Sequence, residues 1–361
     1  MTTFPRPRAD LRALEGYHSP QLDVPVRLNT NESPFPPLPE LVREWTAALE
    51  SQPLHRYPDR TARSLRERLA AQFGQPVERV FAANGSNEVL QTLLLTYGGP
   101  GRKLLVFEPT YALHQHIARI TATEVIEAER DSRFHVSFSE ARTVMDASRP
   151  DLVFLCSPNN PTGTTETRAN VEAIVAAAVE RGNTLVVIDE AYGEFADWTA
   201  FDLVADDVPL VVSRTYSKVW SLAALRLGFC IGPAAVIAEL EKVVLPYHLS
   251  VATQLAGTIA LDHVDEMEAR VKALVDERHR LAERLRRLPG LTVFPSGANF
   301  LLVRPDGDGQ ALWDALVAHG VLVRNFSRWP RLEDCLRITV GTPDENDRCV
   351  AAITAALKEI P

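Results

Sequence analysis

The stretch Thr184-Leu-Val-Val-Ile-Asp-Glu-Ala-Tyr192 places two carboxylates and a tyrosine directly after an apolar run of strand length. No polar residue interrupts that run, which is typical of a parallel strand buried on both faces. Similar runs cover residues 103–107, 152–155 and 210–213. Helical patterns over 65–73 and 88–97 belong to the same region, and strands that alternate with helices predict a mainly parallel α/β sheet.

The pattern changes after about residue 250. A long charged helix is predicted over 264–287, and short strands are predicted near 291–294, 300–303, 321–324 and 335–340, which favours a smaller α+β domain. The proline-rich residues 1–40 cannot form a long helix and predict an extended arm. We therefore expect an arm that forms part of the small domain (1–40), a large ligand-binding domain (41–250) and a small C-terminal domain (251–361).

The bulk composition bounds the class of protein. At 361 residues the chain exceeds one average domain, and its 46% hydrophobic and 24% charged residues are ordinary for a soluble protein. The net charge of −9 argues against a surface that binds nucleic acid or an anionic membrane. Any anion that the protein binds must therefore be held by a few placed arginines.

The cysteines and the N-terminus indicate a cytoplasmic protein. Cys156, Cys230, Cys335 and Cys349 show neither CxxC pairing nor zinc spacing, so we expect reduced, buried thiols. The first ten residues contain no apolar core of a secretory signal, and no apolar run approaches the length of a membrane span.

Four groups of polar residues follow the predicted strands, where open α/β sheets bind their ligands. The first, Asn84-Gly-Ser-Asn-Glu88, opens a helix whose N–H groups suit a phosphate, although an ordinary helix cap explains Ser and Asn equally well. The second, Ser157-Pro-Asn-Asn-Pro-Thr-Gly163, presents two amides from a turn stiffened by proline. A rigid loop without function would look the same.

The other two groups carry the ionisable residues. Asp189 at the end of an apolar strand needs a cationic or hydrogen-bonding partner, unless it merely caps a helix. Lys218 lies in the locally uncharged stretch Ser213-Arg-Thr-Tyr-Ser-Lys218 and becomes a reactive amine if it is desolvated. Ser217 and Arg226 are suited to a dianionic phosphate. Each of these residues alone also fits a surface position.

Taken in order, these groups resemble the fold-type I aminotransferases that depend on pyridoxal 5′-phosphate (PLP), and within them the histidinol-phosphate aminotransferases. The resemblance covers nearly the whole chain. Its motifs are Leu28-Asn-Thr-Asn-Glu32, His55-Arg-Tyr-Pro58, Asn84-Gly-Ser-Asn-Glu88, Pro158-Asn-Asn-Pro-Thr-Gly163, Asp189-Glu-Ala-Tyr192, Ser217-Lys218, Arg226 and Leu336-Arg-Ile-Thr-Val-Gly341. It implies an aspartate aminotransferase-like large domain that binds PLP.

The resemblance also implies roles in cofactor binding. The lysine that matches Lys218 bonds to the PLP aldehyde and moves a proton, and the acid that matches Asp189 keeps the ring nitrogen protonated. Asn160 and Tyr192 match residues that bond the ring 3′ oxygen, and Tyr111 matches the aromatic that stacks on the ring. The phosphate cup corresponds to Gly85, Ser86, Asn87, Thr215, Ser217 and Arg226. At Asn87 the family often has an acid, and this exchange should not abolish phosphate binding.

Substrate recognition is implied for two arginines. Arg337 matches the arginine that clamps the carboxylate of glutamate, and Arg324 matches one that histidinol-phosphate aminotransferases direct toward the substrate phosphate. Tyr57 matches a residue offered by a neighbouring subunit, which implies a homodimer with shared active sites. Tyr17 and Asn31 lie in the arm that folds over the site in this family.

The implied reaction is ping-pong transamination between L-histidinol phosphate and 2-oxoglutarate, which gives imidazole-acetol phosphate and L-glutamate in histidine biosynthesis. Three alternatives remain: an aromatic or broad-specificity aminotransferase, a PLP decarboxylase acting on threonine phosphate, and a PLP-binding regulator without turnover. A regulator would need a DNA-binding domain, for which residues 1–40 are too short. No metal is expected, because the alternating His114 and His116 suit surface or stacking positions.

Overall fold

The computed structural model describes residues 4–12, 14, 16 and 20–359. Its larger sheet has seven strands, and all neighbouring pairs from β7 to β4 are parallel, whereas β8 is antiparallel to both neighbours. In spatial order the strands are β2 (Val80–Ala83), β8 (Gly228–Ile231), β7 (Leu210–Thr215), β6 (Leu185–Asp189), β5 (Leu152–Cys156), β3 (Lys103–Glu108) and β4 (Glu124–Glu129). The predicted mainly parallel sheet is confirmed.

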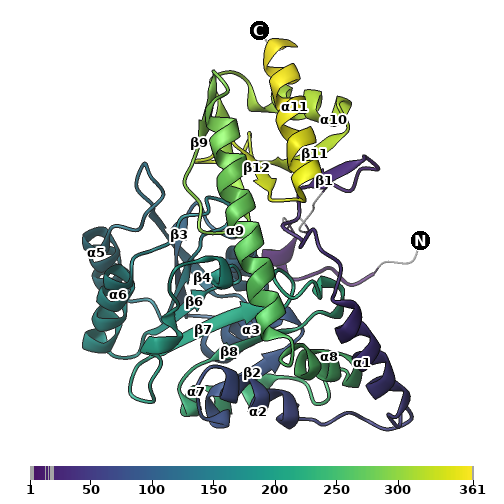
Figure 1. Ribbon diagram of the computed structural model, residues 1–361. Coiled ribbons are helices and arrows are strands. Elements are labelled where there is room, and N and C mark those ends of the chain that lie inside the picture. Colours follow the sequence, from purple (N-terminus) through teal and green to yellow (C-terminus); the bar gives the residue numbers. More distant parts are fainter. Residues whose placement is uncertain (1–3, 13, 15, 17–19, 360–361) are drawn as a thin grey trace.

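Both faces of this sheet are buried beneath helices. On β3, Leu104 packs toward one face and Leu105 toward the other, as the period of two in a strand requires. One face is covered by α3 (Gly85–Tyr97), α4 (Leu113–Ile120) and α7 (Ala234–Val243), and the other by α2 (Arg63–Gln72), α5 (Phe138–Ser148), α6 (Arg168–Arg181) and α8 (Val251–Ala260). Helix α1 (Pro39–Glu50) packs on α8 (Figure 1).

The smaller sheet has five strands and includes part of the N-terminal arm. Its order is β1 (Val26–Leu28), β11 (Val321–Asn325), β12 (Leu336–Thr339), β10 (Phe300–Pro305) and β9 (Leu291–Val293). Strand β1 pairs in parallel with β11, although almost the whole chain separates them, and the other pairs are antiparallel. Helices α10 (Gly309–Ala318) and α11 (Pro343–Glu359) pack on this sheet (Figure 1).

Helix α9 (Val264–Arg286) joins the two parts of the molecule. Its C-terminal half contributes Leu281 and Leu285 to the core of the small sheet, whereas Met267 and Leu274 pack against residues that follow β6 and β7. In Figure 1 this helix rises from the large sheet to the small one. The predicted helix over 264–287 is confirmed to within one residue at its end.

The structure corrects several boundaries expected from sequence. The helix expected from residue 88 begins at Gly85, so the backbone N–H groups of its first turn lie at the end of β2. Strands β1, β2, β4 and β8 were not predicted, because they are short or, in β4, carry exposed acidic residues. The expected state of the cysteines is confirmed, since all four are free and buried.

Candidate active site

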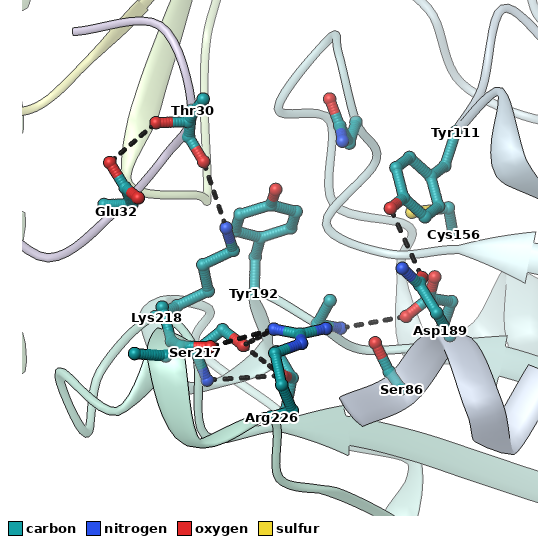
Figure 2. A pocket seen from close by; sticks show the side chains of 16 residues that line it. Thr30, Glu32, Ser86, Tyr111, Cys156, Asp189, Tyr192, Ser217, Lys218 and Arg226 are labelled. Atoms are coloured by element: carbon teal, nitrogen blue, oxygen red, sulfur yellow. Dashed lines mark hydrogen bonds between the residues drawn. The ribbon is translucent and has the colours of Figure 1, made fainter. Parts of the chain in front are cut away.

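A cavity of about 400 Å³ lies where the ends of β5, β6 and β7 meet the first turn of α3. Carboxyl ends of parallel strands form the ligand site of open α/β sheets. Figure 2 shows Lys218 on one side of this cavity, Tyr111 and Asp189 on the other, and Arg226 with Ser86 and Ser217 at its base. Of the predicted residues, Asn87, Asn160, Tyr192 and Thr215 also line it.

The base of the cavity is built from hydroxyls, one guanidinium and closely packed glycines. Arg226 Nη1 donates to Ser217 Oγ at 3.3 Å, and Thr215 Oγ1 donates to the same oxygen at 3.0 Å. A Cβ on Gly85 would lie 2.7 Å from Arg226 Nη2, and one on Gly228 would lie 2.3 Å from the Gly85 carbonyl carbon. Only residues without a side chain leave this cradle open. Donors, a helix N-terminus and a cation together suit a dianion.

The far side of the cavity holds a buried carboxylate. Asp189 is 2% exposed, and its Oδ2 lies 3.0 Å from His114 Nε2. Its Oδ1 accepts from the backbone N–H of Ala191 at 3.1 Å and from Ser213 Oγ at 3.3 Å. Helix capping, which the sequence left open for Asp189, does not describe this position, because the carboxylate faces a cavity and a buried imidazole.

Lys218 is the amine of the site. Its Nζ donates to the Thr30 carbonyl at 3.2 Å, across the cavity from Asp189 (Figure 2). Burial and the nearby charges of Arg337 and Arg226 lower the pKa of Lys218 to about 8, although Glu32 opposes this. A substantial fraction of this amine is therefore neutral near pH 8, as a nucleophile or general base must be.

The arm closes the cavity through three consecutive carbonyls. The Asn29 oxygen accepts from Arg337 Nη2 at 2.8 Å, the Thr30 oxygen accepts from Lys218, and the Asn31 oxygen accepts from Asn299 Nδ2 at 3.2 Å. The side chain of Asn31 also donates to Tyr192 Oη at 2.9 Å. Residues 29–31 therefore tie the small sheet to the site.

Asn31 and Arg337 also make polar contacts with Tyr192 and Asn160. Burial raises the pKa of Tyr192 to about 12, against the opposing effects of Arg337 and the Asn31 hydrogen bond. Arg337 Nη1 donates to Asn160 Oδ1. The phenol of Tyr111 donates to Asn87 Oδ1 at 3.3 Å, and its ring meets that of His114 edge-on.

Three predicted substrate residues lie apart from this cavity or outside the described chain. Tyr57 is 80% exposed and stacks on Tyr247, with ring centroids 4.5 Å apart. Arg324 lines a separate cavity of about 720 Å³, yet its Cα pairs directly with that of Arg337 across β11 and β12. Tyr17 lies outside the residues that the structure describes.

Sequence reasoning missed several residues that the fold brings to the site. Thr30, Glu32, Cys156 and Ala191 line the cavity. His114 was expected at a surface or stacking position, and its surface assignment is wrong because the side chain is completely buried against Asp189. The signal available was its distance of three residues from Tyr111, which places both on one face of a helical turn.

The model of the family described as aminotransferase class I and II matches residues 24–353. The chain belongs to this family. Among curated relatives of this aminotransferase, the histidinol-phosphate aminotransferase of Frankia casuarinae is 44% identical over 361 residues, covering 97% of this chain and 90% of the relative. The enzyme of the same name from Thermobifida fusca is 45% identical, covering 94% and 92%.

Solved structures confirm the fold of the aminotransferase. The histidinol-phosphate aminotransferase of Sinorhizobium meliloti, in complex with pyridoxal-5′-phosphate, superposes with a TM-score of 0.90 at 22% identity, covering 99% of each chain.

Within the described residues no cluster of three potential metal ligands occurs. None of the helices described combines the length and apolar character that crossing a bilayer requires.

Proposed function

We propose that this aminotransferase uses PLP to exchange an amino group between L-histidinol phosphate and 2-oxoglutarate, giving imidazole-acetol phosphate and L-glutamate. The observation that carries the proposal is the identity of 44–45% to two relatives of that name over more than nine-tenths of this chain. The site supports the same reaction, because a reactive amine, a buried acid and an anion cradle face one cavity.

The residues present fit PLP. The cradle closed by Gly85, Ser86, Asn87, Thr215, Ser217 and Arg226 would hold the phosphate, and a Cβ at Gly85 would obstruct it. Asp189 would accept the hydrogen bond of the ring nitrogen, Asn160 and Tyr192 would bond the ring oxygen, and Tyr111 would cover the ring. When bound, PLP supplies an electron sink next to the substrate amine.

The chain contributes proton transfer and orientation. Lys218 accepts the proton that leaves the substrate α-carbon, since its lowered pKa makes the neutral amine available near pH 8. His114 fixes the Asp189 carboxylate from behind, and Asn31 fixes the phenol of Tyr192. These contacts limit the number of orientations that the two catalytic side chains can adopt.

Arg324 and Arg337, the two arginines on the small sheet, would bind the anionic groups of the substrates. Paired residues on antiparallel strands project to the same face, so Arg324 and Arg337 are available to one bound substrate. We assign Arg337 to the carboxylate of glutamate and Arg324 to the phosphate of histidinol phosphate. Asn31 and Tyr17 belong to the arm that covers the substrate.

A homodimer with shared active sites belongs to the same proposal. Tyr57 stacks on Tyr247, and two large apolar side chains near these tyrosines in sequence are exposed: Leu54 at 69% and Leu245 at 76%. Covering them with a second copy would bury a patch that is costly in water and would bring Tyr57 to the partner's cavity. We also propose a cytoplasmic location, with residues 41–250 as the cofactor domain, 251–361 as the small domain and 1–40 as the arm.

Half-reaction spectra test the substrate. Histidinol phosphate added to the PLP form should remove the absorbance of that form within a turnover, whereas phenylalanine should react far more slowly. A clear preference for phenylalanine would favour the aromatic aminotransferase. Release of carbon dioxide from threonine phosphate without a keto acid would instead favour the decarboxylase.

A further inference from the structure

A second cavity of about 510 Å³ lies on the opposite side of the segment that carries Lys218. Its walls are the end of α2, the short 3₁₀ helix η3 (Gly193–Phe195), residues 196–199 and the N-terminal half of α9. We call it the α9 cavity. Among the residues that the structure describes, none belongs to the lining of both this cavity and the active-site cavity.

The lining of the α9 cavity is largely aromatic and aliphatic and includes several charged side chains. Phe73, Trp220, Met267 and Val271 form apolar walls, and Trp220 stacks on Tyr216 with ring centroids 5.0 Å apart. A cavity of this size with a few polar groups is typical of a site for a small flat molecule. The charged residues decide which molecule fits.

Arg214, the buried cation of this lining, bonds closely to Glu190 and only loosely to Glu194. Arg214 donates to Glu190 Oε2 at 2.7 and 3.1 Å, and Glu190 also accepts from Thr199 and the N–H of Ala200. Glu194 forms a longer ion pair with Arg214, 3.5 Å at Oε1, and its Oε2, which is enclosed by protein, has no hydrogen-bond partner among the described residues. Burial accordingly raises the pKa of Glu194.

Acidic side chains at the rim of the α9 cavity add further negative charge. Asp197 and Glu268 line the cavity together with Glu194, against Arg214 and Lys272. Because Arg214 already bonds to Glu190, the cavity presents a surplus of acid to an occupant. A cation with N–H donors would complement the charge of Glu194, Asp197 and Glu268, and a flat ring would fill the space between the aromatic and aliphatic walls.

We propose that the α9 cavity is a binding site for a small aromatic cation, whose ring lies against Phe73, Trp220 and Met267 and whose protonated nitrogens face the acidic side chains of Glu194, Asp197 and Glu268. An occupant would also touch the active site through its wall. Tyr216, Val219 and Trp220 face the α9 cavity, whereas Ser217 and Lys218 face the active-site cavity, and Gly193 follows Tyr192 in the same way. Binding at one cavity should therefore alter the other, and the coupling must be reciprocal.

Benzamidine is a suitable probe, because it is flat, permanently charged near neutral pH and not an amino donor. We expect calorimetry of the PLP-loaded protein to show one benzamidine per chain, and the neutral analogue benzamide to bind at least about tenfold more weakly. Glu194→Gln should weaken benzamidine by a similar factor. Val271→Trp, which fills the cavity, should abolish the heat of binding.

Ala273→Trp is the matched control, because Ala273 lies on an exposed face of the same helix and outside the cavity lining. It should bind benzamidine as the unaltered protein does. Equal binding by the unaltered protein, Glu194→Gln and Val271→Trp would overturn the site, as would no binding at about 10 mM benzamidine. If Val271→Trp fails to fold, as judged by circular dichroism, Glu194→Gln decides.

The coupling has its own readout. With benzamidine bound, the KM for glutamate should change by more than about twofold in the unaltered protein and not in Val271→Trp. Binding without any such change would retain the site and remove the coupling. The calorimetric result does not depend on which amino donor the enzyme prefers, because calorimetry requires no turnover.

Discussion

His114 Nε2 lies 3.0 Å from Asp189 Oδ2, and neither side chain is more than 2% exposed. A carboxylate can only accept, so this distance fits an imidazole that carries its hydrogen on Nε2. The contact comes from α4 on one face of the sheet and reaches the end of β6. It holds the acid that would face the ring nitrogen of PLP in a single orientation.

Loss of this contact should impair the cofactor rather than the fold. We expect His114→Leu to lower kcat by about 10- to 100-fold, the range for a hydrogen bond to a charged group, and to weaken retention of PLP. Equilibrium dialysis of PLP and steady-state rates measure both effects. His114→Leu with unaltered kcat and PLP affinity would show that Asp189 needs no support.

Replacement of the amine should be far more severe. Lys218→Ala should reduce transamination by about 10³-fold or more while the circular dichroism spectrum is retained, because both the covalent anchor and the proton acceptor are lost. Borohydride reduction should label Lys218 in the unaltered protein. Substantial activity of Lys218→Ala with added PLP would contradict the assignment.

The pH dependence of PLP capture by the cofactor-free enzyme follows from the same amine. With a Lys218 pKa of about 8, the neutral, reactive fraction falls about tenfold for each pH unit below that value and levels off above it. The Glu32 charge raises this pKa, so Glu32→Gln should shift the profile to lower pH. Stopped-flow absorbance records the rates. A profile in Glu32→Gln that does not move, or moves upward, would show that Glu32 does not act on Lys218.

The two arginines should separate the substrates. Arg324→Gln should raise the KM for histidinol phosphate by about tenfold and leave that for glutamate nearly unchanged, since only the phosphate loses a charge-assisted contact. Arg337→Gln should raise both. Steady-state kinetics in each direction provide the comparison, and equal effects of Arg324→Gln on both substrates would remove the assignment to phosphate.

The exposed apolar patch predicts the oligomeric state. Leu245→Glu places a charge where a second copy should pack, so we expect the dimer to dissociate and activity to fall as Tyr57 leaves the partner's site. Light scattering gives the mass directly. Lys242→Glu is a control on the neighbouring exposed turn of α7. A monomeric unaltered protein with full activity would contradict the shared site.

The sequence predicted well those elements that depend on local pattern. β5, β6 and β7 are unbroken apolar runs, and their polar ends met at one edge of the sheet as parallel topology requires. β4 was not predicted because the exposed Glu124, Glu127 and Glu129 interrupt its apolar residues. Only Ala128 of β4 is buried, so the strand shows no continuous apolar run.

Contacts between segments that are distant in the chain could not be predicted from the sequence alone. His114 and Asp189 are 75 residues apart, and Asn31 and Tyr192 are 161 apart. The resemblance to known aminotransferases named Asp189, Tyr192 and Asn31 but said nothing of which side chain touches which. Pairing of this kind depends on how α4 and the arm dock, which periodicity does not encode.

The run of three arm carbonyls that receive Arg337, Lys218 and Asn299 has a practical consequence for anyone who shortens this protein. Cutting the chain ahead of α1 would spare most of the hydrophobic interior, so the remainder could still be recovered as a folded product. The shortened chain would nevertheless lack one wall of the active-site cavity and strand β1 at the edge of the smaller sheet. We expect proteolytic removal of residues 26–31 to abolish activity at temperatures at which the large sheet is still folded.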